Sequence, residues 1–202
     1  MLIHLTPQRR VNNNVVTSSA MPAIRVKVHE SLNYLGNYKF IIMDMAKVDL
    51  YLFAETEDSN IKRLFLVQFE GYLPDNEYSY DYPIKDQITL GKNLYLHDGG
   101  ILKLDRVQER RPEGDIAKWI HWLQEKGFAY ELWKELAYHR FVRLIDSAKR
   151  NELLMIYFEN LQDQGLQADN LLNKDGAQHE QLPGLLEAVQ KRALESFEIA
   201  QG

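Results

Sequence analysis

The sequence predicts an α+β fold: a mostly antiparallel sheet of six or seven strands, with late helices packed on it and one returning strand. Strand-like runs fill the chain to about residue 104, and apolar residues at helical spacing first appear after residue 111. A short apolar run at residues 153–158 then has the length and composition of another strand. Strands that precede helices, rather than alternating with them, are typical of α+β proteins.

The sheet is expected to be built around two neighbouring strands at residues 48–53 and 61–69, joined by a polar turn at residues 58–60. Both runs are rich in residues that favour strands, and Asp-Ser-Asn is a common turn composition. The middle of the second run is apolar on both faces, which is typical of a central strand. Arg63 falls on its mainly apolar face. Either its stem packs there while its head reaches the edge, or its head pairs with a carboxylate inside a cleft.

Two further strands are predicted nearer the N-terminus. Residues 23–28 alternate between apolar and basic side chains, as in a short amphipathic strand. Residues 38–45 carry an apolar run that leads almost directly into residue 48. They form either one arm of a tight hairpin or the start of one long bulged strand. Residues 1–22 are polar and lack the apolar core of a secretory signal. We therefore expect a loosely ordered leader at residues 1–22 and a single domain at residues 23–202.

A hairpin is predicted at Asp98-Gly99. Strand-like runs at residues 88–97 and 101–104 flank this pair. Asp-Gly between two such runs favours a two-residue turn, because glycine adopts the positive φ angles that the turn requires. His97 and Asp98 have the residue types of a catalytic pair. Consecutive residues of a strand point to opposite faces, however, so the turn is the favoured interpretation.

Two helices are predicted after residue 111. Asp115 suits the start of the first, where its charge meets the positive end of the helix dipole, and Gly127 ends it. A longer helix is expected at residues 130–149. Its apolar residues gather on one face, and basic residues are concentrated near its C-terminal end.

The last part of the chain combines a strand, a long connection and a helix. Residues 153–158 are apolar without alternation, which favours a buried strand that rejoins the sheet; a continuation of the preceding helix is the alternative. Residues 159–182 are polar, and a connection of this length is either mobile or covers a site. Pro183 suits the first turn of a final helix.

The composition excludes several classes of function. The net charge of −5 argues against a nucleic-acid-binding protein, which is normally basic. The chain has no cysteine, so it has no disulfides and no thiolate ligands. No apolar window is long enough for a membrane span. These features predict a cytoplasmic protein; export would require a signal that this sequence does not contain.

Tyr78, Tyr80 and Tyr82 lie in an acidic segment at residues 75–83, soon after the second central strand. Alternate residues of an extended segment share one side, so the three rings would form one wall of a cleft. Tyrosine hydroxyls hydrogen-bond a ligand while the rings stack on it. The alternative is a segment whose rings pack on the sheet. Together with Arg63, the three tyrosines are the predicted ligand-binding residues.

The acid–base candidates come from separate elements: Glu70, Asp81 and His139. No motif for phosphate binding, zinc proteolysis or serine hydrolysis occurs. The six histidines do not have the spacing of a local metal site. The sequence therefore predicts no metal and no cofactor.

The leading functional hypothesis is a domain that binds a small molecule in a cleft between the sheet and the late helices. The first alternative is an enzyme that uses the separated acid–base residues. The second is a protein-interaction module that uses the tyrosine-rich segment or residues 159–182, with a homodimer as one form of assembly.

Overall fold

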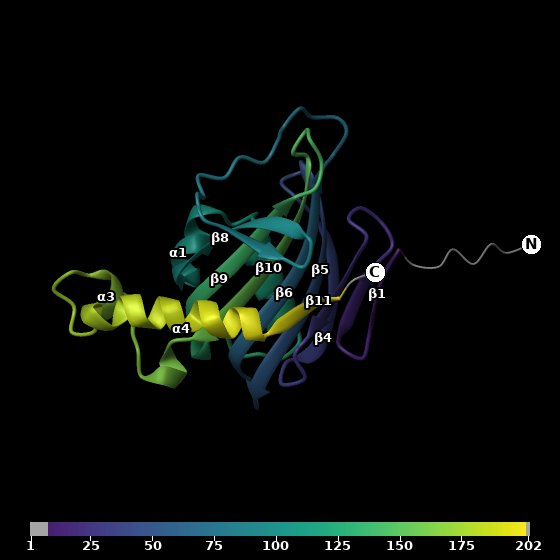
Figure 1. The fold of residues 1–202 in the computed structure, drawn as a ribbon. Coiled ribbons are helices and arrows are strands. Elements are labelled where there is room, and N and C mark those ends of the chain that lie inside the picture. Colours follow the sequence, from purple (N-terminus) through teal and green to yellow (C-terminus); the bar gives the residue numbers. More distant parts are fainter. Residues whose placement is uncertain (1–7, 201–202) are drawn as a thin grey trace, which may run out of the picture.

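The computed structural model describes residues 8–200 and contains two antiparallel sheets (Figure 1). The smaller sheet has the order β1-β2-β3-β11, formed by β1 (Arg9–Asn12), β2 (Val15–Ser18), β3 (Ile24–Val28) and β11 (Phe197–Ala200). The larger sheet has the order β4-β5-β6-β10-β9-β8-β7, formed by β4 (Asn33–Ile42), β5 (Ala46–Glu57), β6 (Asn60–Tyr72), β10 (Asn151–Asn160), β9 (Glu135–Leu144), β8 (Asn93–Lys103) and β7 (Gln87–Leu90). The predicted α+β class, with a mostly antiparallel sheet and one late returning strand, is confirmed.

Most of the helical residues follow the first eight strands. The α-helices are α1 (Leu104–Arg110), α2 (Asp115–Glu125), α3 (Ala168–Leu172) and α4 (Leu182–Glu195), and the short 3-10 turns are η1 (Tyr130–Leu132), η2 (Gln162–Gln164) and η3 (His179–Gln181). The predicted helix from Asp115 and the predicted final helix with Pro183 in its first turn are both confirmed. None of the helices described between residues 8 and 200 is long and apolar enough to cross a membrane.

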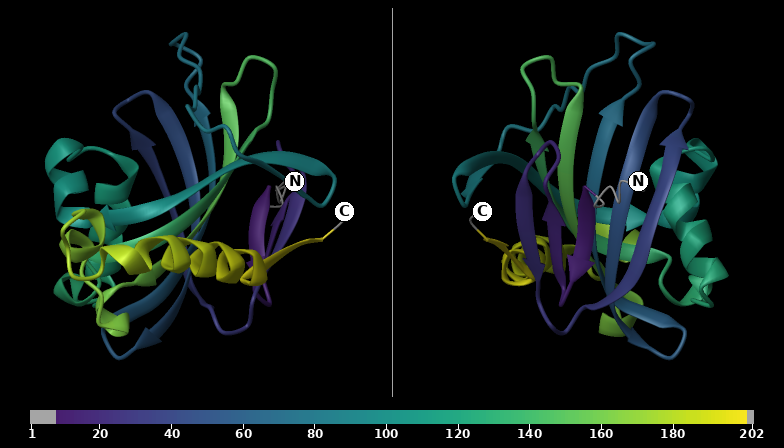
Figure 2. Two further views of the ribbon diagram at one scale, coloured as in Figure 1. Left: turned by 60° about the vertical axis from the view of Figure 1, so that its left-hand side comes forward. Right: turned by 90° about the vertical axis from the view of Figure 1, so that its right-hand side faces the viewer.

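The larger sheet is covered on both faces, and each face has its own hydrophobic core. The smaller sheet and α4 lie on one face, whereas α1 and α2 lie on the other (Figure 2). The central strand β6 serves both cores because its side chains alternate: Phe65 and Val67 belong to the first, and Leu64 and Leu66 to the second. This explains why the middle of β6 is apolar on both sides.

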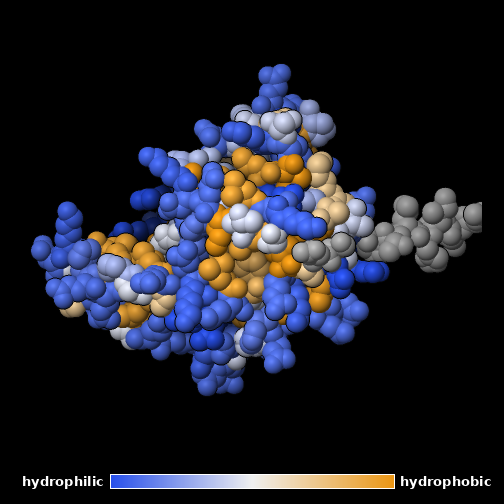
Figure 3. All heavy atoms as spheres, in the orientation of Figure 1, coloured by the Kyte–Doolittle hydropathy of each residue, from blue (hydrophilic) through white to orange (hydrophobic). Residues whose placement is uncertain are grey.

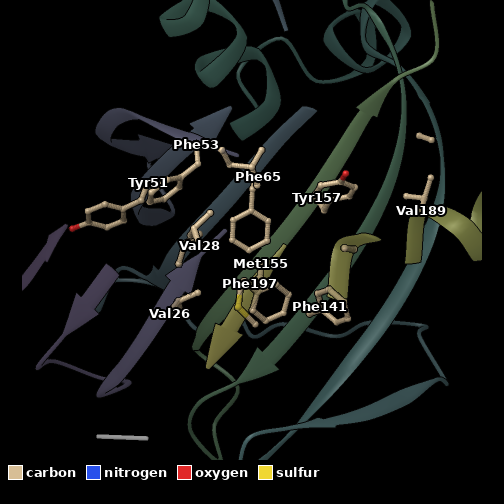
Figure 4. Close-up of a cluster of buried hydrophobic side chains, with 14 of the residues drawn as sticks. Val26, Val28, Tyr51, Phe53, Phe65, Phe141, Met155, Tyr157, Val189 and Phe197 are labelled. Carbon is tan, nitrogen blue, oxygen red and sulfur yellow. The ribbon is translucent and has the colours of Figure 1, made fainter. Parts of the chain in front are cut away.

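The first core is centred on aromatic rings from three parts of the chain (Figure 4). The ring of Phe197 in β11 stacks on Phe65 at a centroid distance of 5.3 Å and meets Phe141 of β9 edge-on at 5.4 Å. Val189 of α4 lies in the same cluster. These contacts join the smaller sheet, the larger sheet and the last helix into one packed unit. On the surface, a hydrophobic area remains above α4, over the β7–β8 hairpin and β10 (Figure 3).

The strand predicted at residues 153–158 is confirmed as β10, and it lies in the middle of the sheet. It pairs with β6 on one side and with β9 on the other. Both faces of a strand in this position are covered, so a continuous apolar run suits it better than alternation does. The predicted pair at residues 48–53 and 61–69 is likewise confirmed as β5 and β6.

The helix predicted at residues 130–149 is wrong, because the middle of this segment is the strand β9 and only Tyr130–Leu132 is helical, as the 3-10 turn η1. Its apolar residues fit helical spacing, but they also serve a strand that is covered on both faces. Ala137 and Phe141 belong to the first core, and Leu136 to the second. Pairing with both β8 and β10 supplies the backbone hydrogen bonds that a helix would otherwise make internally.

The hairpin predicted at Asp98-Gly99 is also wrong. Both residues lie inside the continuous strand β8, opposite Arg140 and His139 of β9. The turn lies earlier, between β7 and β8, where Gly91 has a φ of +63°. Gly99 has a packing role instead: a Cβ there would lie 2.9 Å from His139 Nδ1 and 2.9 Å from the carbonyl oxygen of Tyr138.

The N-terminal segment is more structured than expected. Within the predicted leader, β1 and β2 form a hairpin whose turn residues Asn13 and Asn14 have φ angles of 47° and 57°. Asparagine tolerates this conformation better than most residues. Residues 1–7 of the leader lie outside the described part of the chain. Of the two alternatives for residues 38–45, the structure has the tight hairpin, which joins β4 to β5 through Met43 and Asp44.

A buried ion pair attaches α4 to the larger sheet. Glu159 of β10 is only 3% exposed, and its Oε2 accepts a hydrogen bond from Arg192 Nη2 at 2.7 Å. Glu159 Oε1 also accepts a hydrogen bond from the Tyr157 hydroxyl at 2.8 Å. Removing one partner of a buried pair leaves the other charge uncompensated, which costs more than the pair contributes.

Arg192→Met should therefore lower the free energy of unfolding by about 2–4 kcal/mol, because it leaves the Glu159 carboxylate buried without its cation. Lys191→Met is the matched control, since Lys191 is the exposed neighbour on the same helix. Denaturant melts of the two variants test this. Equal stability of the two would show that the ion pair does not anchor α4.

Candidate functional site

Two glutamates lie directly opposite one another on the two central strands of the larger sheet, near one end of each strand. Glu70 of β6 and Glu152 of β10 are register partners in the antiparallel ladder. Directly opposite residues of such a ladder project to the same face, with their Cβ atoms about 5 Å apart. Glu152 is 2% exposed, and Glu70 is partly buried. We call these two residues the glutamate pair.

The tyrosine-rich segment folds back over the glutamate pair. The Tyr80 hydroxyl donates a hydrogen bond to Glu70 Oε1 at 2.9 Å, and the Tyr82 hydroxyl donates to Glu152 Oε2 at 2.8 Å. Gln68, two residues before Glu70 on the same face of β6, donates from Nε2 to Glu70 Oε2 at 2.7 Å. The Tyr80 ring also stacks on Tyr72 at a centroid distance of 4.5 Å. Each carboxyl group therefore has a tyrosine donor of its own.

Arg150 holds this segment in place from the β9–β10 turn, which lies beside it in Figure 1. Its guanidinium donates to the carbonyl oxygens of Tyr78 at 2.8 Å and Leu73 at 2.6 Å. The backbone N–H of Tyr80 donates to the carbonyl oxygen of Lys149 at 2.8 Å. The segment is thus tied to the strands that carry the glutamate pair.

Burial is the main cause of raised pKa values in the glutamate pair. Desolvation raises the pKa of Glu152 to about 8, and the nearby Glu70 raises it further, against the Tyr82 hydrogen bond and the positive charge of Arg140. Desolvation also raises the pKa of Glu70 to about 7, and the charge of Asp115 in α2 adds to it. The hydrogen bonds from Tyr80 and Gln68 act in the opposite direction. Burial therefore favours the protonated form of the pair.

Arg140 is the cation whose charge lowers the pKa of Glu152, and Asp98 holds its guanidinium in place. Arg140 Nε and Nη2 donate to the two carboxylate oxygens of Asp98 at 2.9 and 2.7 Å. Its guanidinium lies 5.3 Å from the centroid of the Tyr82 ring. Asp98, which was expected to form a turn, instead holds the arginine that flanks the site.

The structure brings together three of the predicted site residues: Glu70, Tyr80 and Tyr82. Tyr80 is buried, so its ring packs within the protein and its hydroxyl is directed to Glu70. Tyr78 is 55% exposed, and its ring packs at the outer side of the cluster, with its centroid 5.8 Å from that of Tyr72. Asp81 lies between the two inward-facing tyrosines and is exposed to solvent.

The other two predicted site residues lie elsewhere. Arg63 pairs with Glu55 at 2.9 Å, toward the opposite end of β6. His139 is 4% exposed and packs in the first core, where its Nε2 lies 3.2 Å from His97 Nδ1. Burial and the nearby His97 lower the pKa of His139 to about 4, so it is neutral at pH 7. Among residues 8–200, no group of three or more histidine, aspartate and glutamate side chains is arranged to hold a metal ion.

Sequence reasoning missed Glu152, Gln68 and the Arg140–Asp98 pair. Glu152 precedes the apolar run of β10 and has no motif around it. Its significance depends on the pairing of β10 with β6, which brings residues 70 and 152 together. Only a prediction of this strand register would have identified it.

A cleft of about 520 Å³ opens on the opposite face of the sheet from the carboxyl groups of the glutamate pair. It lies where the ends of β4, β5, β6 and β10 meet Arg9 of β1, on the face of the sheet to which Phe69 projects. Glu70 and Glu152 are among its lining residues, but because side chains alternate along a strand their carboxyl groups lie on the other face, toward α2. The basic lining residues are Arg9, Lys39 and Lys47, and Asp49 is acidic. Met21, Phe40, Ile41 and Phe69 are among its apolar ones. The cleft predicted between the sheet and the late helices would lie on α4 or α2; this one lies next to the N-terminal hairpin.

The raised pKa values predict that stability falls at alkaline pH. The folded pair binds protons that the unfolded chain has already lost, so its contribution is fully present below about pH 4.5 and is lost as pH rises through about 7 to 8. The loss should approach about 1.4 kcal/mol per pH unit for each proton. The double variant Glu70→Gln/Glu152→Gln should show a flatter melting temperature between about pH 6 and about pH 9.

Glu77→Gln serves as the control, because Glu77 is an exposed carboxylate of the same segment. It should keep the wild-type pH dependence. If the double variant and the control lose stability equally with rising pH, the glutamate pair does not titrate in this range.

Comparison with known proteins finds no matching family model, no matching curated protein and no matching solved structure.

Proposed function

We propose that this protein binds a small organic anion with an apolar body in the cleft lined by Arg9, Lys39 and Lys47. The main support for this proposal is the charge of the side chains that line the cleft. Three cations line the cleft on this face of the sheet, against one carboxylate, Asp49. A lining of this charge favours an anion.

The three cations differ in whether they already contact other side chains of the protein. Arg9 Nη1 lies 3.4 Å from Asp49 Oδ2, and its guanidinium covers the Phe69 ring at 4.1 Å. Lys39 Nζ lies 3.7 Å from the same carboxylate oxygen, but its side chain is 67% exposed. Lys47 is exposed as well. Arg9 and Asp49 therefore contact each other within the lining of the cleft, and Lys39 and Lys47 are the side chains able to contact an anionic ligand.

The apolar lining and the size of the cleft support a ligand with an apolar body. Met21 and Ile41 are 56% and 44% exposed, which is high for large apolar side chains, and both line the cleft. Its volume of about 520 Å³ lies within the range of small-molecule sites. An aromatic or short aliphatic carboxylate has a negative charge for the lysines and an apolar body for the apolar side chains of the lining.

The second candidate is an enzyme that uses the glutamate pair for acid–base chemistry. The observation that favours it is a pair of carboxyl groups whose pKa values, about 7 and about 8, suit proton transfer near neutral pH. In this version Glu70 and Glu152 replace Asp81 and His139 as the reactive groups. Turnover of a bound ligand, lost in Glu152→Gln, would favour the enzyme over the binding protein.

The same proposal includes a cytoplasmic location and a small-molecule ligand rather than nucleic acid. The net charge of −5 and the absence of cysteine support it.

Isothermal titration calorimetry with phenylpropionate tests the proposal, with the neutral phenylpropionamide as the matched ligand. The wild type should bind the carboxylate and bind the amide more weakly, because only the carboxylate attracts the cations. Lys39→Gln/Lys47→Gln should weaken phenylpropionate binding by about tenfold.

Lys92→Gln is the control variant, since Lys92 is an exposed lysine in the turn between β7 and β8. It should leave binding unchanged. Absence of binding, or equal affinity for the amide and the carboxylate, would contradict the proposed function.

A further inference from the structure

We infer that the ligand of the cleft carries a neutral hydrogen-bond donor, a phenolic hydroxyl, which donates to Asn151 Oδ1 on the floor of the cleft. This inference rests on the proposed function. It narrows the ligand class from apolar carboxylates in general to hydroxylated aromatic carboxylates. It also assigns Asn151 as the residue that determines this specificity.

The strand register places four lining positions of the cleft in one row across the sheet. Lys47 of β5, Gly71 of β6 and Asn151 of β10 are partners in the two ladders, and Ile41 of β4 lies opposite Lys47. Positions in such a row project to one face, so these four project to the face of Phe69 and not to that of the glutamate pair. All four line the cleft.

Gly71 is the lowest point of this row, and the amide of Asn151 occupies the space above it. A Cβ at Gly71 would overlap Asn151 Oδ1, so the absence of a side chain there is what admits the amide oxygen. Asn151 is partly exposed and lines the cleft. Its Oδ1 therefore lies on the floor of the cleft, close to the backbone of β6.

Asp146, in the turn between β9 and β10, fixes which end of the Asn151 amide faces Gly71. Asn151 Nδ2 donates to Asp146 Oδ2 at 3.0 Å, and the Asn151 backbone N–H donates to the same oxygen at 2.8 Å. Burial acts to raise the pKa of Asp146, but these and other hydrogen bonds outweigh it and lower the pKa, so the carboxylate is ionised at pH 7. An ionised carboxylate only accepts hydrogen bonds, so the NH₂ end must face Asp146 and the oxygen must face Gly71.

Asn151 Oδ1 is an acceptor that the protein itself does not use. Among residues 8–200, both hydrogen bonds of the Asn151 side chain and backbone N–H to Asp146 are donated by nitrogen, and none is accepted by Oδ1. Polar atoms inside a binding cleft need a partner from water or from the ligand. A carboxylate has no proton to donate, so the anionic end of the ligand does not satisfy this oxygen. A donor at the other end of the ligand does.

The charges around the floor favour a neutral donor over a cationic one. Lys47 lies beside Gly71 in the row, and the guanidinium of Arg9 covers the neighbouring Phe69 ring at 4.1 Å. Asp49 is already paired with Arg9. A ligand ammonium group at the floor would meet these positive charges, whereas a hydroxyl would not. A phenol with a pKa of about 10 keeps its proton at pH 7 and so remains a donor.

The two contacts define the two ends of the ligand. Lys39 and Lys47 have exposed side chains, so their ammonium groups stand at the mouth of the cleft. Asn151 Oδ1 lies at the floor. A ligand that makes both contacts has its carboxylate and its hydroxyl at opposite ends of the apolar body, as para-hydroxyphenylpropionate does.

The test compares three ligands on the wild type by isothermal titration calorimetry at about pH 7. Para-hydroxyphenylpropionate should bind about fivefold more tightly than phenylpropionate, the gain expected for one hydrogen bond. Para-methoxyphenylpropionate keeps the oxygen but has no proton to donate. It should bind no more tightly than phenylpropionate. This comparison needs no variant, so it does not depend on the folding of any substitution.

Variants then assign the preference to Asn151. The readout is the ratio of the two Kd values, phenylpropionate over its para-hydroxy derivative, because the ratio cancels any effect common to both ligands. Asn151→Ala removes the acceptor and should lower the ratio from about five to about one. Gly71→Ala, which places a methyl group where Oδ1 lies, should lower it as well. Asn37→Ala is the control, since Asn37 is an exposed asparagine of β4, and it should keep the wild-type ratio.

The outcomes separate this inference from the proposed function. Equal affinity of the wild type for phenylpropionate and its para-hydroxy derivative overturns the inference and leaves anion binding intact. The same holds if the methoxy compound binds as tightly as the hydroxy compound, or if the preference persists in folded Asn151→Ala. Absence of binding of both carboxylates overturns the inference and the proposed function together. Melting temperatures establish that each variant is folded before the ratios are compared.

Discussion

The antiparallel pairing of β10 with β6 is the constraint on which the rest of the structure depends. β10 comes late in the chain, yet it lies between β6 and β9 and joins the two halves of the larger sheet. Its register places Glu152 opposite Glu70, and a shift by one residue would send every side chain of β10 to the other face. The apolar residues of β10 that fill both cores therefore also position the glutamate pair.

Burying two carboxyl groups side by side is costly, and the surrounding structure offsets that cost. The tyrosine-rich segment supplies one hydroxyl donor to each glutamate. Arg150 in turn holds the segment by its carbonyl oxygens. The part of the desolvation free energy that these contacts do not offset appears as raised pKa values, because burying a protonated carboxyl group costs less free energy than burying an ionised one. Strongly perturbed pKa values cluster at functional sites, which makes the glutamate pair a candidate for a functional role.

The errors in the prediction from sequence have a common physical cause. The segment of β9 has apolar residues at helical spacing, and Asp98-Gly99 has the composition of a turn. In the structure, β8, β9 and β10 pair over most of their length, and these long-range hydrogen bonds override the local preferences. Propensity is a weak guide where a strand is covered on both faces, because neither face then needs to be polar.

The sequence by itself determined the fold class, the central pair β5 and β6, the apolar strand β10 and the helices that begin near Asp115 and Pro183. These features follow from local composition, which depends only on neighbouring residues. Tyr80, Tyr82 and Glu70 were also recognised locally. The tertiary structure alone decided that Tyr82 meets Glu152, that Asp98 holds Arg140 and that His139 faces the opposite core. Each of these depends on strand register between distant segments, which local composition does not encode.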